Sequence, residues 1–191
     1  QVSNVNAAQG TVYLNADGAI EDHDPVGGLI TADTLVSGAG SIGLGGPSST
    51  PGANALDIRV ATLIGDNVKG ESYFDEVDAI RIERFQTDGD FDLYAGGDVT
   101  IHQILASSDY INIEANGGIT IVRTEPAPGV IEDGIGKVQL TALDGSILLD
   151  AGAIGISAGD IELTAIGGSI GTALLPMLTE TNAANGSGID A

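Results

Sequence analysis

The chain has 191 residues, of which 42% are hydrophobic, yet Phe, Trp and Tyr together account for only 4%. With 27 acidic and 6 basic residues it has a formal net charge of −21, which repels nucleic acid and anionic membranes and makes both poor candidate partners. It contains no cysteine, which excludes disulfides and thiolate metal sites, and no apolar run reaches the roughly 18 residues that a membrane-inserted helix needs.

One pattern recurs along the chain, at residues 12–20, 91–101, 111–121, 138–148 and 161–170. In each copy apolar and polar residues alternate up to an Ala, a turn containing Gly follows, and a second alternating pair comes next. Alternation of period two places the apolar residues on one face of a strand, and Gly or Asn supplies the positive φ values that corners need. Residues 55–66 and 78–85 are weaker copies, whose charged residues we expect to point outward: Arg59, Arg81, Glu83 and Arg84.

The spacing of the copies predicts the architecture. Four equivalent apolar residues lie 20, 27 and 23 residues apart, and Leu14 precedes the first of them by 79; the four are Leu93, Ile113, Leu140 and Leu163. The interval of 27 contains segment 124–134, which its Pro and Gly residues mark as an inserted loop. Such a period indicates a repeat protein, and short strands without helical periodicity favour an all-β parallel β-helix. We predict about eight coils of roughly 20 residues, stacked about 4.8 Å apart into a rod on the order of 40 Å long.

Residues 1–178 are expected to form this single β-solenoid domain, and residues 179–191 a polar tail or a connection to a following segment. The four equivalent apolar residues should line up in one row along the axis. Narrow coils should leave no space for aromatic side chains, in agreement with their scarcity. Outward loops 21–28, 46–54 and 124–134 are predicted contact surfaces.

Several phrases resemble the repeats of filamentous-haemagglutinin-like exoproteins, which are very large secreted or surface-attached β-solenoids of bacteria. They are "GDVTI" (97–101), "GGITIV" (117–122), "DGSILLDA" (144–151), "GGSIGTALLPML" (167–178) and the longer segment 56–82. The resemblance implies a right-handed parallel β-helix, export to the cell surface or medium, and adhesion or matrix building. It implies no catalytic residues.

Clustered carboxylates are the candidate metal ligands, because Ca²⁺ binds six to eight oxygens. They lie in two short stretches and comprise Asp75, Glu76 and Asp78, then Asp88, Asp90 and Asp92. Calcium is therefore the one candidate cofactor. Neither stretch matches an EF-hand loop or a calcium-binding β-roll, so the alternative is that these carboxylates only form a solvated acidic surface. His23 could join Glu21, Asp22 and Asp24 at a metal or be a solvated loop residue, and alternation points His102 outward.

Two alternatives to adhesion are a carbohydrate-active enzyme and an ice- or crystal-binding protein. A β-helix polysaccharide lyase or hydrolase needs paired carboxylates or a basic residue beside a metal-bound uronate, but the six basic residues are scattered. An ice- or crystal-binding face needs flat ladders of Thr, whereas Thr100 and Thr120 follow the turn and Thr141 and Thr164 precede it. We therefore expect a non-enzymatic, structural or adhesive protein.

The ends of a solenoid expose unpaired backbone unless they are covered. Neither terminal segment has the pattern of a helical cap, so we expect end-to-end self-association or continuation of a longer chain. The other expected partners are glycans or proteins of a host surface or matrix. The expected location is extracellular or on the cell surface.

Overall fold

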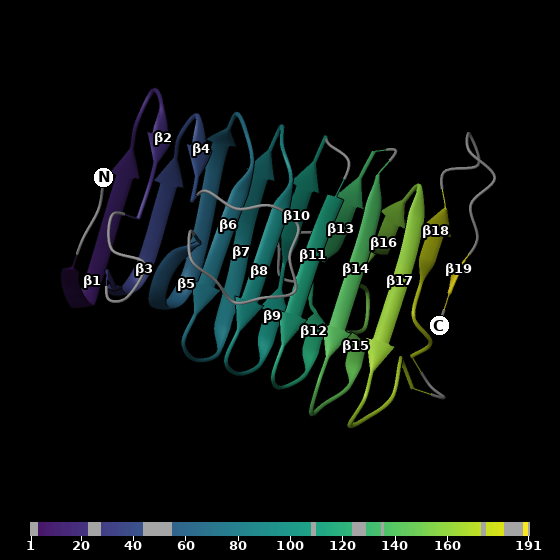
Figure 1. Cartoon of the computed structure of the whole chain (residues 1–191). Helices are drawn as coiled ribbons and strands as arrows, with labels where there is room; N and C mark the ends of the chain where they lie inside the picture. The colour runs from purple at the N-terminus through teal and green to yellow at the C-terminus, as the bar shows by residue number, and fades with distance from the viewer. Residues whose placement is uncertain are drawn as a thin grey trace.

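The computed structural model describes residues 4–22, 28–43, 55–107, 110–123, 129–134, 136–172, 175–181 and 189–190. These residues form a parallel β-solenoid of about seven turns, which winds from the N-terminus at one end to the C-terminus at the other (Figure 1). The all-β fold predicted from the repeat is confirmed. No helix occurs in this part of the chain, and hence none that is long and apolar enough to cross a membrane.

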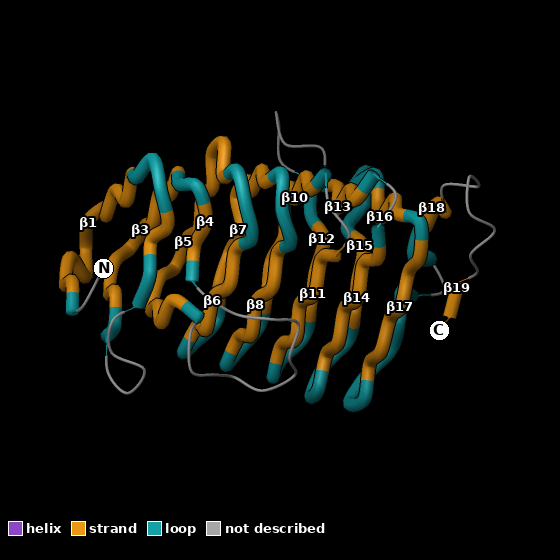
Figure 2. Tube along the Cα trace, turned by 45° about the horizontal axis from the view of Figure 1, so that its top comes forward, coloured by secondary structure: helices purple, strands orange, loops and turns teal. Residues whose placement is uncertain are grey.

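Strands of successive coils pair in parallel and fall into three ladders, with loops at the corners between them (Figure 2). The first ladder contains β6 (Ser72–Glu76), β8 (Phe91–Ala95), β11 (Tyr110–Ala115), β14 (Lys137–Ala142), β17 (Asp160–Ala165) and β19 (Ile189–Asp190). The second contains the end of β7 (Ile80–Thr87), then β10 (Gln103–Ala106), β13 (Val130–Asp133), β16 (Gly155–Ala158) and β18 (Thr179–Thr181). The third contains the start of β7, then β9 (Val99–Ile101), β12 (Ile119–Ile121) and β15 (Ile147–Leu149).

The N-terminal coils use longer strands that pass across a corner without a break. They are β1 (Val5–Asn15), β3 (Ile30–Gly38) and β5 (Leu56–Val68), with the short strands β2 (Ala19–Ile20) and β4 (Ser41–Ile42) between them. Equivalent residues are 25 apart from β1 to β3 and 28 apart from β3 to β5, as Val5↔Ile30 and Ile30↔Ile58 pair in register. These coils are longer than the repeat spacing predicts, which is why about seven turns form in place of about eight.

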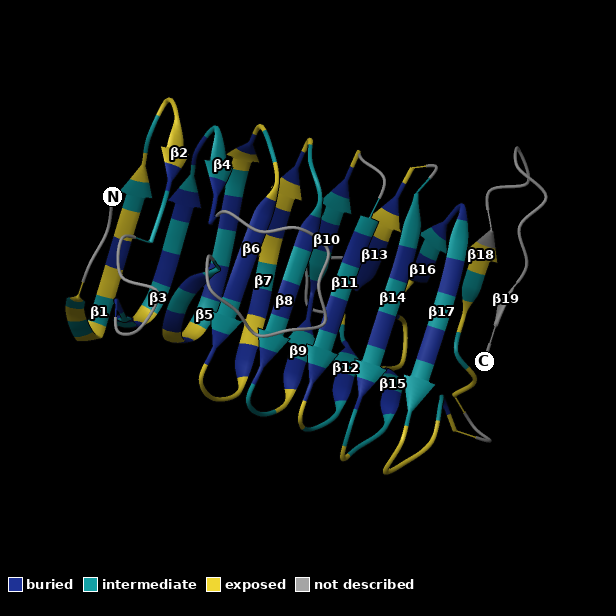
Figure 3. Cartoon of the chain, in the orientation of Figure 1, coloured by how far each residue is buried: buried dark blue, intermediate teal, exposed yellow. Residues whose placement is uncertain are grey.

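The predicted row of apolar residues is confirmed. Leu93 pairs with Ile113, Ile113 with Leu140, and Leu140 with Leu163, and all four are buried. Figure 3 shows buried residues alternating with half-buried ones along strands such as β8, β11 and β14. Each coil contributes one side chain to each row, so its apolar face is covered only by the coils before and after it.

The expectation that coils exclude aromatic side chains is wrong at one place. All three phenylalanines of the chain are buried together, with ring centroids 4.6 Å apart for Phe85 and Phe91 and 5.7 Å apart for Phe74 and Phe85. A small neighbour makes room for them: a Cβ on Gly65 would lie 2.4 Å from the Phe85 ring. Three large residues therefore fit where the adjacent coil lacks a side chain.

Parts of the predicted contact loops and of the tail lie outside the described residues, namely 23–27, 46–54, 124–128, 182–188 and 191. Within the tail, β18 and β19 continue the stack by pairing with β16 and β17.

Shortening one side chain of the central row should weaken the whole fold. We expect Ile113→Ala to lower the free energy of unfolding by about 3 kcal/mol, because a fully buried side chain between Leu93 and Leu140 would leave a cavity. Denaturant unfolding followed by circular dichroism measures the change. Thr141→Ala, on the outward side of β14, is the control and should cost less than about 0.5 kcal/mol. Equal losses for the two variants would contradict the row as the main source of stability.

Candidate functional site

The outward side of the first ladder carries polar side chains on each of the strands β8, β11, β14 and β17, joined by tyrosines on β8 and β11. Alternation turns every second residue of β8, β11, β14 and β17 away from the core, and none of these outward residues is aliphatic. Three of the chain's four tyrosines lie on this ladder. The outward residues of the four strands are Asp92, Tyr94, Tyr110, Asn112, Glu114, Lys137, Gln139, Thr141, Asp160, Glu162 and Thr164.

Four planar polar groups stand in one register across these strands. Asp92 pairs with Asn112, Asn112 with Gln139, and Gln139 with Glu162, so that carboxylate, amide, amide and carboxylate follow one another coil by coil. We call these four residues the amide–carboxylate row. Neighbouring strands of a sheet lie about 4.8 Å apart, which sets the repeat of the row along the axis.

Hydrogen bonds fix the side chains of the row. The Asn112 amide donates to Oδ1 of Asp92 over 3.0 Å, and Nζ of Lys137 donates to Oε2 of Glu162. The hydroxyl of Tyr110 donates to Oε1 of Gln139 over 2.9 Å. These hydrogen bonds therefore fix the orientation of the row's side chains within the folded chain.

Two tyrosine rings flank the row on opposite sides. Tyr110 lies two residues before Asn112 on β11, and Tyr94 lies two residues after Asp92 on β8. The Tyr94 hydroxyl accepts a hydrogen bond of 2.9 Å from Nδ2 of Asn116. Burial raises the pKa of Tyr110, with a further contribution from the Asp92 carboxylate. Burial also raises the pKa of Asp92 to about 6, opposed by its hydrogen bond from Asn112.

The predicted calcium ligands are distributed over several environments. Asp75 and Asp92 point outward on the first ladder, where Asp75 is in register with Asp57 of β5 and Tyr94 of β8. Burial, followed by the charges of Asp75 and Asp22, raises the pKa of Asp57 to about 6, and burial raises that of Asp75.

Glu76 points the other way, into the interior. It is 0% exposed and occupies a position of the core row between Ile58 and Ala95. Its carboxylate accepts hydrogen bonds from the backbone N–H of Val60 at 2.8 Å and of Asp78 at 3.0 Å. Burial raises its pKa to about 7, although these backbone donors lower it. Glu76 thus satisfies backbone groups at the corner after β6.

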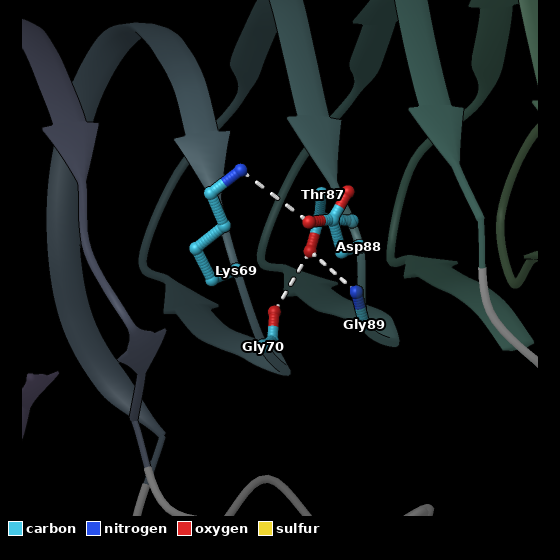
Figure 4. Close-up of polar contacts among 5 residues, drawn as sticks. All are labelled: Lys69, Gly70, Thr87, Asp88 and Gly89. Atoms are coloured by element: carbon cyan, nitrogen blue, oxygen red, sulfur yellow. Dashed lines mark hydrogen bonds and ion pairs between the residues drawn. The ribbon is translucent and has the colours of Figure 1, made fainter.

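The remaining candidates lie at corners and next to cations. Oδ2 of Asp78 is 3.3 Å from Nε of Arg59, and Oδ2 of Asp88 is 3.5 Å from Nζ of Lys69. Figure 4 shows the corner beside Asp88, where the Thr87 hydroxyl donates to the Gly70 carbonyl over 2.8 Å and accepts from the Gly89 N–H over 3.0 Å. The Thr87 hydroxyl ties two successive coils together at this point.

In the part of the chain that the structure describes, no group of three or more Asp, Glu, His or Cys side chains is arranged to hold a metal ion. The backbone carbonyl of Asp90 accepts a hydrogen bond from the Ser72 N–H at 2.8 Å, which places Asp90 at the corner before β8. The six predicted ligands therefore occupy the interior, the outer face and separate corners. Acidic residues that are neighbours in the sequence do not come together in one site here, because alternate residues point to opposite sides of a strand.

One prediction about the histidines is wrong. His102 is buried, with 3% of its surface exposed, where alternation predicted an outward side chain. The alternation breaks because His102 occupies the corner between β9 and β10, and burial lowers its pKa. His23 and Asp24 lie outside the described residues.

The predicted outward cations are confirmed as exposed, and each has an acidic partner. Arg81 contacts Glu83 at 2.6 Å and Arg84 contacts Asp66 at 2.6 Å, in addition to the Arg59–Asp78 pair. Exposed pairs of this kind contribute little to stability. They neutralise part of the surface without forming a basic cluster.

Threonine rows also occur, on two different ladders as predicted. Thr100 pairs with Thr120 on the third ladder, and Thr141 with Thr164 on the first. A further row, which the spacing did not reveal, contains Thr11, Thr34 and Thr62. Arg81 occupies the next position and separates this row from Thr100. The interruption breaks the flat row that a crystal-binding face requires.

The amide–carboxylate row was also not recognised from the sequence, although its signal is present there. The second residue of the phrases "FDLYA", "INIEA", "VQLTA" and "IELTA" is always a carboxylate or an amide. Comparison of the chain with models of known protein families, with curated proteins and with solved structures finds no match. The site is accordingly interpreted from its own geometry.

Stability should depend on pH through Glu76. Its pKa of about 7 in the folded protein lies above its ordinary value of 4.5, so the folded state binds the proton more tightly than the unfolded state. Stability is then highest below about pH 4.5 for this group and falls as the pH rises to about 7, by roughly 2–3 kcal/mol. Urea unfolding at pH 5, 6, 7 and 8 should show the fall, and Glu76→Gln should make it shallower. If the free energy of unfolding of Glu76→Gln fell with pH as steeply as that of the unmodified protein, other groups would be responsible. The surface variant Gln86→Ala is the control and should keep the full pH dependence.

Calcium should act on this chain no more specifically than magnesium, because the six acidic residues do not converge. We expect equal concentrations of the two ions to raise the melting temperature by similar amounts, through screening of the −21 charge. Differential scanning calorimetry with each chloride salt measures this. A much larger rise with calcium, abolished by Asp88→Asn or Asp75→Asn, would instead establish a specific calcium site.

Proposed function

We propose that the chain is a structural and adhesive segment of a bacterial extracellular or cell-surface β-solenoid protein, in which such segments extend end to end into a filament or matrix. The observation that carries this proposal is the in-register pairing of equivalent residues across four successive coils, at Leu93, Ile113, Leu140 and Leu163. Stacked coils give length and stiffness, and the same registration repeats outward side chains at regular intervals.

The resemblance of the repeats to filamentous-haemagglutinin-like exoproteins supports the same proposal. Proteins of that kind are exported and present an extended solenoid to their surroundings. The strongly acidic, polar exterior suits a surface-exposed rod, since it keeps the protein soluble and limits association with anionic membranes.

A first experiment examines the native material. We expect electron microscopy and small-angle scattering of protein isolated from its source to show rods far longer than the roughly 34 Å that a stack of about seven turns spans. Antibodies against the chain should label the outside of intact cells. Compact monomers only, or label confined to the cell interior, would contradict the proposal.

A second experiment separates adhesion from catalysis. An adhesive rod should tolerate any one outward substitution, whereas a polysaccharide lyase or hydrolase loses its activity when a single acid or base is removed. Incubation with neutral and uronate polysaccharides, followed by assays for new reducing ends and unsaturated products, should show no turnover. Turnover lost in one variant, such as Asp92→Asn, would establish the carbohydrate-active enzyme instead.

A further inference from the structure

We propose that the outer face of β8, β11, β14 and β17 binds an uncharged, extended glycan that lies along the solenoid axis over the amide–carboxylate row. This inference rests on the proposed adhesive function and names the partner of that surface. It follows from the register, the chemistry and the charge of the outward side chains.

The register gives the face the periodicity of a linear polymer. Asp92, Asn112, Gln139 and Glu162 present one planar polar group per coil, at the strand spacing of about 4.8 Å. This repeat is close to the length of one sugar ring in an extended chain. Successive sugars can therefore meet equivalent side chains on successive coils, and each weak contact is repeated along the polymer.

The chemistry of the row matches sugar hydroxyls, which both donate and accept hydrogen bonds. A carboxylate has about four lone-pair sites and an amide combines two donors with an acceptor, so one internal bond leaves each group with further capacity. Asp92 and Asn112 use one such bond with each other, and Gln139 accepts one from Tyr110. The rings of Tyr94 and Tyr110 add flat surfaces on which sugar C–H groups can rest.

The row is preorganised and accessible. Its bonds to Lys137 and Tyr110 hold the side chains in a single arrangement, which reduces the entropy lost on binding. The side chain of Glu162 is 40% exposed and that of Lys137 is 33% exposed. A ligand can therefore reach the Glu162 end of the row without any opening of the fold, and the other three residues are half-buried.

Other partners fit this face less well. A protein partner would need an apolar centre to its interface, and the outward residues of these four strands include no aliphatic side chain. An anionic glycan would be repelled by the carboxylates of Asp92, Glu114 and Glu162. A cationic chain would meet the like charge of the Lys137 ammonium, which lies on this face and already pairs with Glu162. An uncharged glycan combines the available hydrogen bonds without these conflicts.

The inference is tested with the purified chain and defined oligosaccharides. Calorimetric and NMR titrations with linear hexasaccharides of glucan, mannan and xylan should detect binding, with amide shifts concentrated on β8, β11, β14 and β17. Hexagalacturonate and oligolysine, as anionic and cationic probes, should bind at least tenfold more weakly. We expect the double variant Asn112→Ala/Gln139→Ala to weaken neutral glycan binding by about tenfold or more, because each removes hydrogen bonds to the sugars.

The matched control is Gln86→Ala/Gln103→Ala, which removes two outward amides from β7 and β10. Tyr94→Phe should retain the affinity, and Tyr94→Ala should lower it only in part, because the ring is one contact among several repeated ones. Circular dichroism of each variant confirms folding. The inference is overturned if no neutral hexasaccharide binds, if oligolysine or hexagalacturonate binds more tightly, or if the control pair weakens binding as much as the row variant.

The outcome is separable from that of the proposed function. Rods on the cell surface together with an absence of glycan binding would overturn this inference and leave the structural role intact. Binding by the purified chain, with no rods and no surface label, would support the face and contradict the proposed role.

Discussion

The structure depends on the parallel, in-register stacking of each coil on the next. A single coil has an apolar side that it cannot cover by itself, and the backbone N–H and C=O groups of its strands have no partners within the coil. Both needs are met by the neighbouring coils, which supply the next member of every side-chain row and the next strand of every ladder. The solenoid is consequently stable only as a stack, and each coil depends on its neighbours in the same way.

Departures from the repeat are absorbed locally. Three phenylalanines fit because Gly65, on the adjacent coil, leaves space beside Phe85. A buried carboxylate is tolerated because Glu76 replaces an apolar residue where two backbone N–H groups need acceptors, that of Val60 on the adjacent coil and that of Asp78 two residues along the chain. The energetic cost of desolvating the carboxylate remains and is expressed as its raised pKa.

These observations explain how much the sequence could predict. Alternation and spacing are properties of one phrase, and they predicted the ladders, the central row and the outward cations. His102 could not be placed in this way, since its burial depends on a corner where alternation stops. The inward direction of the Glu76 side chain could not be predicted either. A run of acidic residues suggests one shared site, whereas consecutive residues of a strand point to opposite faces. The phenylalanine cluster requires knowledge of which residues lie across from one another, and this is fixed only by the register. The amide–carboxylate row is visible in the aligned phrases, because their second residue is a carboxylate or an amide in every copy from 91 to 165.

The same register links the stability of the fold to the character of its surface. Because inward residues must align from coil to coil, the outward residues between them align as well, whether or not they contribute to stability. A repeated polar position thus becomes a straight row of like groups, as Asn112 and Gln139 illustrate. Such a row can meet a repeating ligand through many equivalent weak contacts, without the converging constellation that a catalytic site needs. Loss of one contact then lowers affinity by a fraction, while loss of the register would remove the row and the core together. The recognition proposed for this surface would therefore depend on the same stacking that folds the chain.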